Sequence, residues 1–246
     1  MKVRNSVAFV TGANRGLGLA FTRALLAGGA RKVYGGARDP DSITLPGIVP
    51  VRLDVADAAS IEAAAAACGD VDLLINNAGI ARGRSFLGAG AIEAARAELE
   101  TNYFGPLLTS RAFAPILARS GGGAIVNVLS SGGLVAVPAM GGYSPSKFAG
   151  RAAAACIRAE LAGQGTKVSA LIVGSVDTRM AAHVAGHKEA PADIAKAGLT
   201  AIKRGIDEMD TDLMALEVRA SLARDPKALE RGMARMLDAE VISTGR

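Results

Sequence analysis

Short apolar runs alternate with longer amphipathic segments along most of the chain. Six runs rich in Val, Ile, Leu and Ala predict buried strands over 6–10, 32–36, 48–53, 71–75, 124–129 and 167–173. Between them, apolar residues recur at helical spacing, which predicts helices over 16–26, 60–67, 91–117 and 146–162. Strands that alternate with helices are typical of βαβ units and of a parallel sheet covered on both faces. The pattern therefore predicts an α/β fold.

This alternation further predicts how the layers are arranged. Crossover connections between parallel strands are almost always right-handed, so we expect a single Rossmann-like, doubly wound parallel sheet in three layers, α/β/α. Ligands of such sheets bind at the carboxyl ends of the strands. We find no internal repeat and no linker-like change of composition, so we expect one dinucleotide-binding and catalytic domain over 1–246.

The alternation of strands and helices stops after residue 173. A polar, loop-like stretch over 174–190 is followed by an amphipathic helical pattern over 191–237. Long loops in compact domains are usually functional or disordered. We therefore interpret 174–237 as a helical substrate lid followed by C-terminal helices, with a surface loop of no special role as the alternative.

Composition excludes several classes of protein. Half of the 246 residues are apolar and 21% are charged, unlike a disordered chain. The longest uncharged run, 120–146, is interrupted by glycines and prolines, so we predict no membrane span. The first apolar stretch is too short for a secretory signal, which favours a cytoplasmic protein. Cys68 and Cys156 are too few and too far apart for a disulfide framework, and we expect both to be buried, reduced thiols.

Positive charge is concentrated at the start of the chain. Residues 1–38 hold seven basic and no acidic side chains, whereas residues 151–246 hold 14 basic and 13 acidic ones. Aromatic residues make up only 4% of the chain and there is no Trp, so little material is available for stacking on bases. The distribution favours a small phosphorylated ligand over nucleic acid.

A glycine-rich turn joins the first strand to the first helix. The sequence TGANRGLG, residues 11–18, has the spacing GxxxGxG. Glycines at such a turn let the backbone approach a pyrophosphate, and the helix N-terminus offers free N–H groups. The turn predicts a dinucleotide site, with a merely structural tight turn as the alternative.

A phenol and an ammonium group lie four residues apart in YSPSK, residues 143–147. If the helix has begun there, Tyr143 and Lys147 share one face, and a nearby cation would lower the pKa of the phenol. Ser130 ends the fifth predicted strand, where its hydroxyl can bond a substrate carbonyl. Each of these residues alone has an ordinary structural explanation.

Six motifs in order make the chain similar to the short-chain dehydrogenase/reductase family, in its branch of about 250 residues. Besides TGANRGLG and YSPSK, these are Asp54-Val55, the stretch NNAG at 76–79, Asn102 in TNYFGPL and Ser130 in NVLS. The resemblance covers nearly the whole chain up to about Met180. It implies an oxidoreductase that transfers a hydride between a nicotinamide and a carbonyl or alcohol, with the cofactor carrying the chemistry.

The resemblance also implies a role for each residue. Ser130 would hold the substrate carbonyl, Tyr143 would pass the proton, and Lys147 would bind ribose hydroxyls while lowering the pKa of Tyr143. Asn102 would help to hold a water that links Lys147 to solvent. The implied cofactor-binding residues are Gly12, Asn14, Gly16, Leu17, Gly18, Asp54, Val55, Asn76, Ala78, Gly79, Tyr143, Lys147, Val176 and Thr178. Positive charge adds Arg15 and Arg38 to this set.

Charge at the end of the second strand favours NADPH over NADH. NAD enzymes carry an acidic residue there for the ribose 2′-hydroxyl, whereas NADP enzymes need a cation for the 2′-phosphate. Here Ala37 is followed by Arg38, and Arg15 lies in the glycine turn, so two guanidinium groups could clamp one phosphate. Asp39 complicates this argument, and we expect it to pair with Arg38.

The chain departs from the family pattern at two places. Val173-Gly174 replaces the usual Pro-Gly, and the usual last strand with its Asp-Gly-Gly turn is missing, its place taken by Asp207-Glu208-Met209-Asp210. Because that ending supports tetramers in the family, we expect a dimer or a monomer.

The predicted mouth of the site is apolar and holds no metal. Its apolar residues are Leu134, Val137, Met140, Met180 and Val184, which suggests an apolar carbonyl or alcohol substrate, with a lid that packs on its own core as the alternative. His183 and His187 lie four apart but have no third ligand, so we expect them to be exposed rather than to bind metal.

We expect an NADP-dependent carbonyl reductase. An NAD-linked alcohol dehydrogenase and a non-catalytic NADPH-binding sensor are the alternatives. The complete set Asn102, Ser130, Tyr143 and Lys147 argues against the sensor, because a protein that only binds has no need of proton-transfer groups. Sugar-nucleotide epimerases share the Tyr/Lys chemistry but resemble a longer branch with a larger C-terminal domain.

Overall fold

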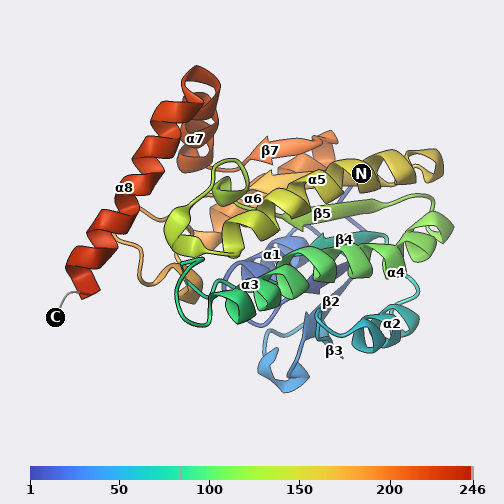
Figure 1. Cartoon of the computed structure of the whole chain (residues 1–246). Coiled ribbons are helices and arrows are strands. Elements are labelled where there is room, and N and C mark those ends of the chain that lie inside the picture. The colour runs from blue at the N-terminus through green and yellow to red at the C-terminus, as the bar shows by residue number, and fades with distance from the viewer. Residues whose placement is uncertain (84, 245–246) are drawn as a thin grey trace.

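The computed structural model describes residues 1–83 and 85–244, and its centre is one parallel sheet of seven strands (Figure 1). The strand order is β3-β2-β1-β4-β5-β6-β7, the doubly wound order with the reversal between β1 and β4. The strands are β1 (Val7–Thr11), β2 (Lys32–Ala37), β3 (Ile48–Arg52), β4 (Leu73–Asn76), β5 (Ala124–Val128), β6 (Lys167–Ile172) and β7 (Glu208–Asp210). The predicted three-layer α/β fold is confirmed.

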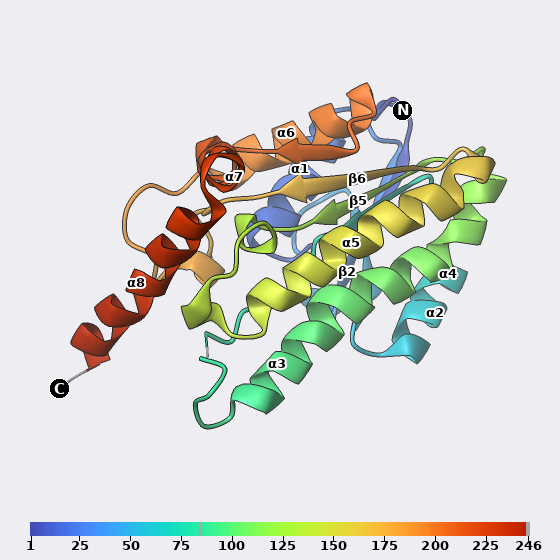
Figure 2. The ribbon, with the colours of Figure 1, turned by 45° about the horizontal axis from the view of Figure 1, so that its top comes forward.

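Helices cover both faces of the sheet (Figure 2). On one face α1 (Gly16–Ala27) packs against α6 (Pro191–Arg204), and on the other lie α2 (Ala58–Ala67), α4 (Gly105–Arg119) and α5 (Tyr143–Leu161). Each face has its own apolar core, with Phe21 and Leu25 in the first and Phe9 and Phe113 in the second. Strands buried on both faces explain why the sequence shows continuous apolar runs rather than alternation.

The helix predicted over 91–117 is present but interrupted. It consists of α3 (Ala91–Leu99), a π-helical turn η2 (Glu100–Phe104) and α4. Pro106 stands in the first turn of α4, where a missing N–H costs nothing. The π turn contains Asn102, one of the predicted site residues. Such turns occur frequently at functional sites.

The prediction for the C-terminal part was wrong in one respect. The region predicted as helical over 191–237 contains α6, then the strand β7, then α7 (Leu213–Arg224) and α8 (Pro226–Thr244). A last strand is therefore present, although the family's Gly-Gly turn is not. β7 was missed because Glu208, Met209 and Asp210 have little strand propensity. They pair with Ala170, Leu171 and Ile172 of β6.

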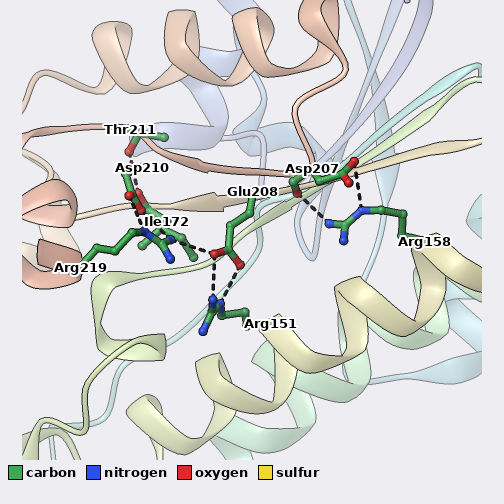
Figure 3. A network of polar contacts seen from close by, with 8 residues as sticks. All are labelled: Arg151, Arg158, Ile172, Asp207, Glu208, Asp210, Thr211 and Arg219. Atoms are coloured by element: carbon green, nitrogen blue, oxygen red, sulfur yellow. Dashed lines mark hydrogen bonds and ion pairs between the residues drawn. The ribbon is translucent and has the colours of Figure 1, made fainter. Parts of the chain in front are cut away.

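Ion pairs with arginines of α5 and α7 hold β7 in place (Figure 3). Arg151 of α5 forms a bidentate pair with Glu208, at 2.6 and 2.9 Å, and Arg219 of α7 reaches the same carboxylate at 2.8 Å. Arg219 also contacts both oxygens of Asp210, at 2.6 and 2.8 Å. Arg158 adds a hydrogen bond of 2.7 Å to the carbonyl oxygen of Asp207. The last strand is thus held by arginine contacts in addition to its backbone pairing with β6.

Short 3-10 helices complete the described structure. They are η1 (Pro40–Ser42), η3 (Ser131–Gly133), η4 (Pro138–Met140), η5 (Ala162–Gln164) and η6 (Arg179–Ala181). α8 extends away from the sheet and contacts η4 and α7. Among the described residues, none of the helices combines the length and the hydropathy that crossing a bilayer requires.

The two cysteines differ in exposure. Cys68 is fully buried, as predicted, and burial raises the pKa of its thiol to about 12. Cys156 is exposed, so the prediction for it was wrong. It lies two residues beyond the buried Ala154 on α5, which turns it about 200° away from the packed face of the helix.

Candidate active site

The glycine turn between β1 and α1 has the predicted geometry. Gly12 and Gly16 have φ angles of +66° and +53°, in the left-handed region where other residues are strained. A Cβ at Gly18 would overlap the carbonyl oxygen of Gly12, so only glycine lets the helix pack this closely on the turn. Leu17 packs against the core of the α1 face.

The N-terminus of α1 is suited to a phosphate. Arg15 is the N-cap residue of α1, but its side chain makes no hydrogen bond to the helix. The first turn of α1 contains no acidic residue. Within the described residues, no side chain therefore competes for the free N–H groups of that turn. The nearby Asn14 donates to the hydroxyl of Ser42 at 3.1 Å.

The end of β2 presents one cation. Ala37 is buried and Arg38, directly after it, is exposed. The predicted pairing of Asp39 with Arg38 was wrong: among the described ion pairs none joins them. Asp39 instead caps η1 by accepting from the backbone N–H of Asp41 at 3.2 Å. Arg38 and Arg15 take part in none of the described ion pairs.

The segment after β4 is tied to the glycine turn. The Thr11 hydroxyl accepts from the N–H groups of Asn77 and Ala78, at 3.0 and 2.9 Å. The Asn77 amide donates to the carbonyl oxygens of Thr11 and Gly12, at 2.9 and 3.3 Å. Sequence reasoning quoted Asn77 within its motif but gave it no role. Its contacts hold the segment after β4 against the glycine turn.

Asn76 points into the core. Its amide nitrogen donates to Asn127 at 2.9 Å and to Ser110 at 3.1 Å, and its Oδ1 atom is buried without a partner among the described residues. The side chain therefore links β4, β5 and α4. Any contact of Asn76 with a cofactor is left to its backbone.

Asp54 and Val55 follow β3. The Asp54 carboxylate accepts from the N–H of Ala56 at 3.0 Å, which shapes the loop. Val55 is buried, and its backbone and side chain approach Gly105 so closely that a Cβ there would be tightly packed, 3.0 Å from the Val55 carbonyl oxygen. The structure thus brings this loop against the start of α4.

The four predicted catalytic residues lie together at the carboxyl end of the sheet. α5 begins at Tyr143, so Tyr143 and Lys147 share a helix face, and the Lys147 Nζ atom lies 5.5 Å from the phenol ring centre. Ser130 Oγ accepts from the N–H of Gly132 at 3.1 Å. A Cβ at Gly132 would lie 3.5 Å from Ser130 Oγ and 3.7 Å from the Tyr143 ring, so both face the same space.

Asn102 joins the two halves of this site. Its side chain is buried and exchanges two hydrogen bonds of 2.9 Å with the backbone of Ile80. Its amide also donates to Ser146 of α5 at 3.1 Å. A Cβ at Gly79 would lie 3.2 Å from Asn102 Oδ1 and 3.7 Å from Lys147 Nζ, which places the NNAG segment beside both.

Burial dominates the electrostatics of the pair. Burial lowers the pKa of Lys147 to about 8, and its Nζ donates to the carbonyl oxygen of Val128 at 3.1 Å. Burial also raises the pKa of Tyr143, with a further rise from the charge of Glu98 and a partial offset from the Ser130 hydroxyl. The pKa of Tyr143 was predicted to be lowered, but in this structure it is raised, and burial is the largest cause.

Val176 and Thr178 start the loop after β6. Val176 is buried and forms an isolated bridge with Glu189, which closes the loop at its base. A Cβ at Gly16 would lie 3.3 Å from the Thr178 methyl group, so this loop contacts the glycine turn. Gly174 has no room for a Cβ because the Asp212 carboxylate packs on it and accepts from its N–H at 2.7 Å.

The residues of the predicted apolar mouth differ in exposure. Leu134 is buried, Val137, Met140 and Val184 are half-buried, and Met180 is exposed. The two lid histidines are both exposed, as expected, and His187 contacts Glu189 at 3.1 Å. Among the described residues, no cluster of His, Cys, Asp and Glu is suited to a metal ion.

Known proteins share both sequence and fold with this chain. The family model for short chain dehydrogenases matches residues 6–189. A crystal structure of a short chain dehydrogenase from Burkholderia cenocepacia in complex with NADP is 43% identical, with a TM-score of 0.91, and the match covers 95% of this chain and 99% of that one. A Brucella melitensis 3-ketoacyl-(acyl-carrier-protein) reductase complexed with NADH is 25% identical, with a TM-score of 0.78 over 85% of this chain and 98% of that one.

Curated relatives match over a shorter part of their length. Dehydrogenase/reductase SDR family member 7B of Mus musculus is 35% identical over 194 residues, which cover 72% of this chain but only 60% of the relative. A 3-alpha-(or 20-beta)-hydroxysteroid dehydrogenase of Mycobacterium tuberculosis is 34% identical over 188 residues, 71% of this chain and 70% of the relative. Together with the family match over most of the chain and the arrangement of Ser130, Tyr143, Lys147 and Asn102, these similarities show that the chain belongs to the short-chain dehydrogenase/reductase family of oxidoreductases.

Proposed function

We propose that the protein is an NADP(H)-dependent oxidoreductase that reduces a ketone or aldehyde, or oxidises the corresponding secondary alcohol. The observation that carries this proposal is the shared space between Ser130 Oγ and the Tyr143 phenol, beside Lys147. A hydrogen-bond donor and a proton donor that converge on one point suit a carbonyl oxygen.

The residues around the glycine turn fit a dinucleotide. Glycines with positive φ, an uncapped helix N-terminus and two exposed arginines match the diphosphate and the 2′-phosphate of NADP. The similar Burkholderia protein, 43% identical, was solved with NADP, which supports the same choice here. Arg15 and Arg38 would hold the 2′-phosphate, and Lys147 the ribose hydroxyls on the nicotinamide side.

When bound, the nicotinamide supplies the hydride. The chain's own residues then orient the carbonyl and handle the proton. Ser130 donates to the carbonyl oxygen, and Tyr143, which burial keeps protonated at neutral pH, delivers its proton to the same oxygen. Asn102 links α5 to the segment after β4, so that Tyr143 and Lys147 stay beside that segment.

The substrate is proposed to be small and apolar. Leu134, Val137 and Met140 follow Ser130 along the chain, and Met180 and Val184 lie in the loop after β6. An apolar mouth favours an apolar carbonyl compound, because burial of apolar surface supplies binding energy. The dimeric or monomeric state and the cytoplasmic location remain predictions.

The first experiment is a titration of the purified protein with NADPH and with NADH, followed by a panel of apolar ketones and aldehydes. We expect tighter binding of NADPH and turnover of at least one panel member, read from the nicotinamide absorbance. Tighter binding of NADH would contradict the role of the arginines. Tight binding without any turnover would favour the sensor.

Replacement of the phenol tests the proton donor. Tyr143→Phe removes one hydroxyl, so we predict at least a tenfold loss of kcat with nearly unchanged affinity for NADPH. The matched control is Tyr34→Phe, which removes a hydroxyl that bonds Asp70 at 2.9 Å, outside the site. Retention of more than about a tenth of the rate in Tyr143→Phe would exclude Tyr143 as the proton donor.

A further inference from the structure

Glu98 is a buried carboxylate that the proposed mechanism does not use. It lies near the end of α3 and is 1% exposed. Among the described residues, the other buried groups that carry charge in water are Lys147 and Asp212. Asp212 is explained by its fold: it caps α7 through the N–H of Ala215, at 3.0 Å, and holds Gly174. Within the part of the chain that the structure describes, the one hydrogen bond to the Glu98 carboxylate comes from the backbone N–H of Arg82, at 2.6 Å.

The position of Glu98 connects two parts of the site. Arg82 belongs to the segment after β4, beyond Gly79 and Ile80. The second carboxylate oxygen lies under Gly142, where an added Cβ would be 2.8 Å from Oε2 and 2.7 Å from the Cβ of Ala95. Gly142 is the residue directly before Tyr143 and the N-cap of α5. The lack of a side chain at Gly142 is what lets the carboxylate approach the catalytic turn.

The charge of Glu98 acts on the phenol. Among the described residues, three polar or charged groups lie near Tyr143: Lys147 on its own helix, 5.5 Å from the ring centre, Ser130 at the end of β5, and Glu98 on α3, beside Gly142. A negative charge close to a phenol disfavours a second negative charge on it. Burial raises the pKa of Glu98, and Arg82 partly offsets this rise through its backbone N–H and its charge. A carboxyl group ordinarily loses its proton at a much lower pH than a phenol does.

We propose that Glu98 is a positioning residue that acts through Tyr143: it fixes the Gly142–Tyr143 turn against the segment after β4 and holds the phenol in its proton-donating form. This inference rests on the proposed function and refines it, since a phenol that keeps its proton suits reduction of a carbonyl better than oxidation of an alcohol. No substrate contact is assigned to Glu98.

The test is a spectrophotometric titration of tyrosine in the full-length protein without added cofactor. The chain has three tyrosines and no Trp, so tyrosinate absorbance is measured with little background, and subtraction of the Tyr143→Phe spectrum isolates Tyr143. Glu98→Gln keeps an acceptor for the Arg82 N–H and removes the charge. We expect the pKa of Tyr143 to fall by at least about half a unit in Glu98→Gln. The matched control Glu93→Gln, on the exposed side of the same helix, leaves it unchanged.

A second measurement needs no variant of Glu98. The measurement is an NMR titration of the unsubstituted protein with ring-labelled tyrosine. We expect the chemical shift of Tyr143, plotted against pH, to show an additional step on the acid side of the phenol titration, as Glu98 takes up its proton. An unchanged pKa of Tyr143 in Glu98→Gln, or a Tyr143 resonance without the acid step, would overturn the proposal. Neither readout depends on turnover, so a failure of the proposed function would be distinguishable from a failure of this inference.

A merely structural role is separated by the pH dependence of the reaction. If Glu98 only braces the loop, Glu98→Gln lowers kcat equally at all pH values. If Glu98 acts on the phenol, the acid limb in the plot of kcat for alcohol oxidation against pH moves to lower pH in Glu98→Gln. The reason is that the phenolate, which accepts the proton, then forms at lower pH than in the unsubstituted protein. A uniform loss with an unshifted limb would overturn the proposed action on Tyr143.

Discussion

Lys147 carries an ammonium group into a site with little solvent. Its exposed fraction is 5%, and burial lowers its pKa to about 8 from the ordinary value of 10.5. Below pH 8 the group is charged in both the folded and the unfolded chain, and only the folded chain has to desolvate that charge. The residue that the site needs thus reduces the stability of the fold.

We therefore predict that Lys147→Met stabilises the protein at neutral pH. The lowered pKa of Lys147 corresponds to a gain in the free energy of unfolding of at most about 3 kcal/mol in the variant. The contribution of the lost hydrogen bond to the Val128 carbonyl oxygen must be subtracted from this gain. The greater stability of the variant is fully present below pH 8 and disappears as pH rises from about 8 to about 10.5. Over this range Lys147 loses its proton at lower pH in the folded chain than in the unfolded chain. Denaturant unfolding of both proteins at several pH values checks this, and a less stable variant at pH 7 would mean that the hydrogen bond outweighs desolvation.

Arg38 is the residue that we propose as the main determinant of the choice between NADPH and NADH. Arg38→Asp places a carboxylate where a 2′-phosphate would lie, so we predict NADPH binding weaker by at least about tenfold and improved use of NADH. Arg111→Asp, an equally exposed change on α4, is the control for altered net charge. Unchanged preference in Arg38→Asp would mean that the 2′-phosphate is held elsewhere.

Residues of the site were easier to predict than their electrostatics. The turn glycines follow one another at fixed spacing around the start of α1. Tyr143 and Lys147 are four residues apart at the start of α5, so their proximity follows from the geometry of that helix. Burial depends on the whole fold, which is why the direction of the Tyr143 pKa was wrong. Glu98 gave no sequence signal, because a glutamate on an amphipathic helix is usually solvated.

At the scale of elements, the strands within the core were predicted to within about two residues, as continuous apolar runs allow. The π turn between α3 and α4 could not be predicted, because it differs from an α-helix only in hydrogen-bond register. β7 could not be predicted either, because its three residues owe their conformation to β6 and to Arg151 and Arg219.

The ion pairs around β7 lead to a prediction about acid stability. Arg151, followed by Arg219, holds the pKa of Glu208 below its ordinary value, so this carboxylate stabilises the fold above about pH 4.5. We predict that Glu208→Gln lowers the free energy of unfolding by about 1 kcal/mol at pH 7, with a smaller difference as pH falls through the folded pKa. The control is Glu217→Gln on the exposed face of α7. A loss that does not vary with pH would mean that charge is not the cause.

At the scale of the whole molecule, the candidate site draws on loops from both halves of the sheet. The glycine turn, the ends of β2, β4 and β5 and the loop after β6 all contribute to it. A ligand bound there stabilises every one of these elements against unfolding.

We therefore predict that NADPH raises the melting temperature of the protein as a unit. At an NADPH concentration of about 100 times the dissociation constant, the free energy of unfolding rises by about 2.7 kcal/mol. For a chain of this length, this corresponds to a rise in melting temperature of roughly 5–10 °C. NADH at the same concentration gives a smaller shift if Arg15 and Arg38 select the phosphate. Differential scanning calorimetry measures both, and equal shifts would contradict NADPH preference.

The strand order also determines how the chain can assemble during synthesis. β1 pairs with β2 and β4, and β2 with β3, so the first 76 residues contain four adjacent strands. Each later strand adds to the same growing edge, first β5 on β4, then β6, then β7. Sheet growth therefore follows the order in which the ribosome delivers the strands. Until β5 emerges, β4 with its buried Leu73, Leu74 and Ile75 forms an open edge, and this is where a nascent chain is most exposed to aggregation.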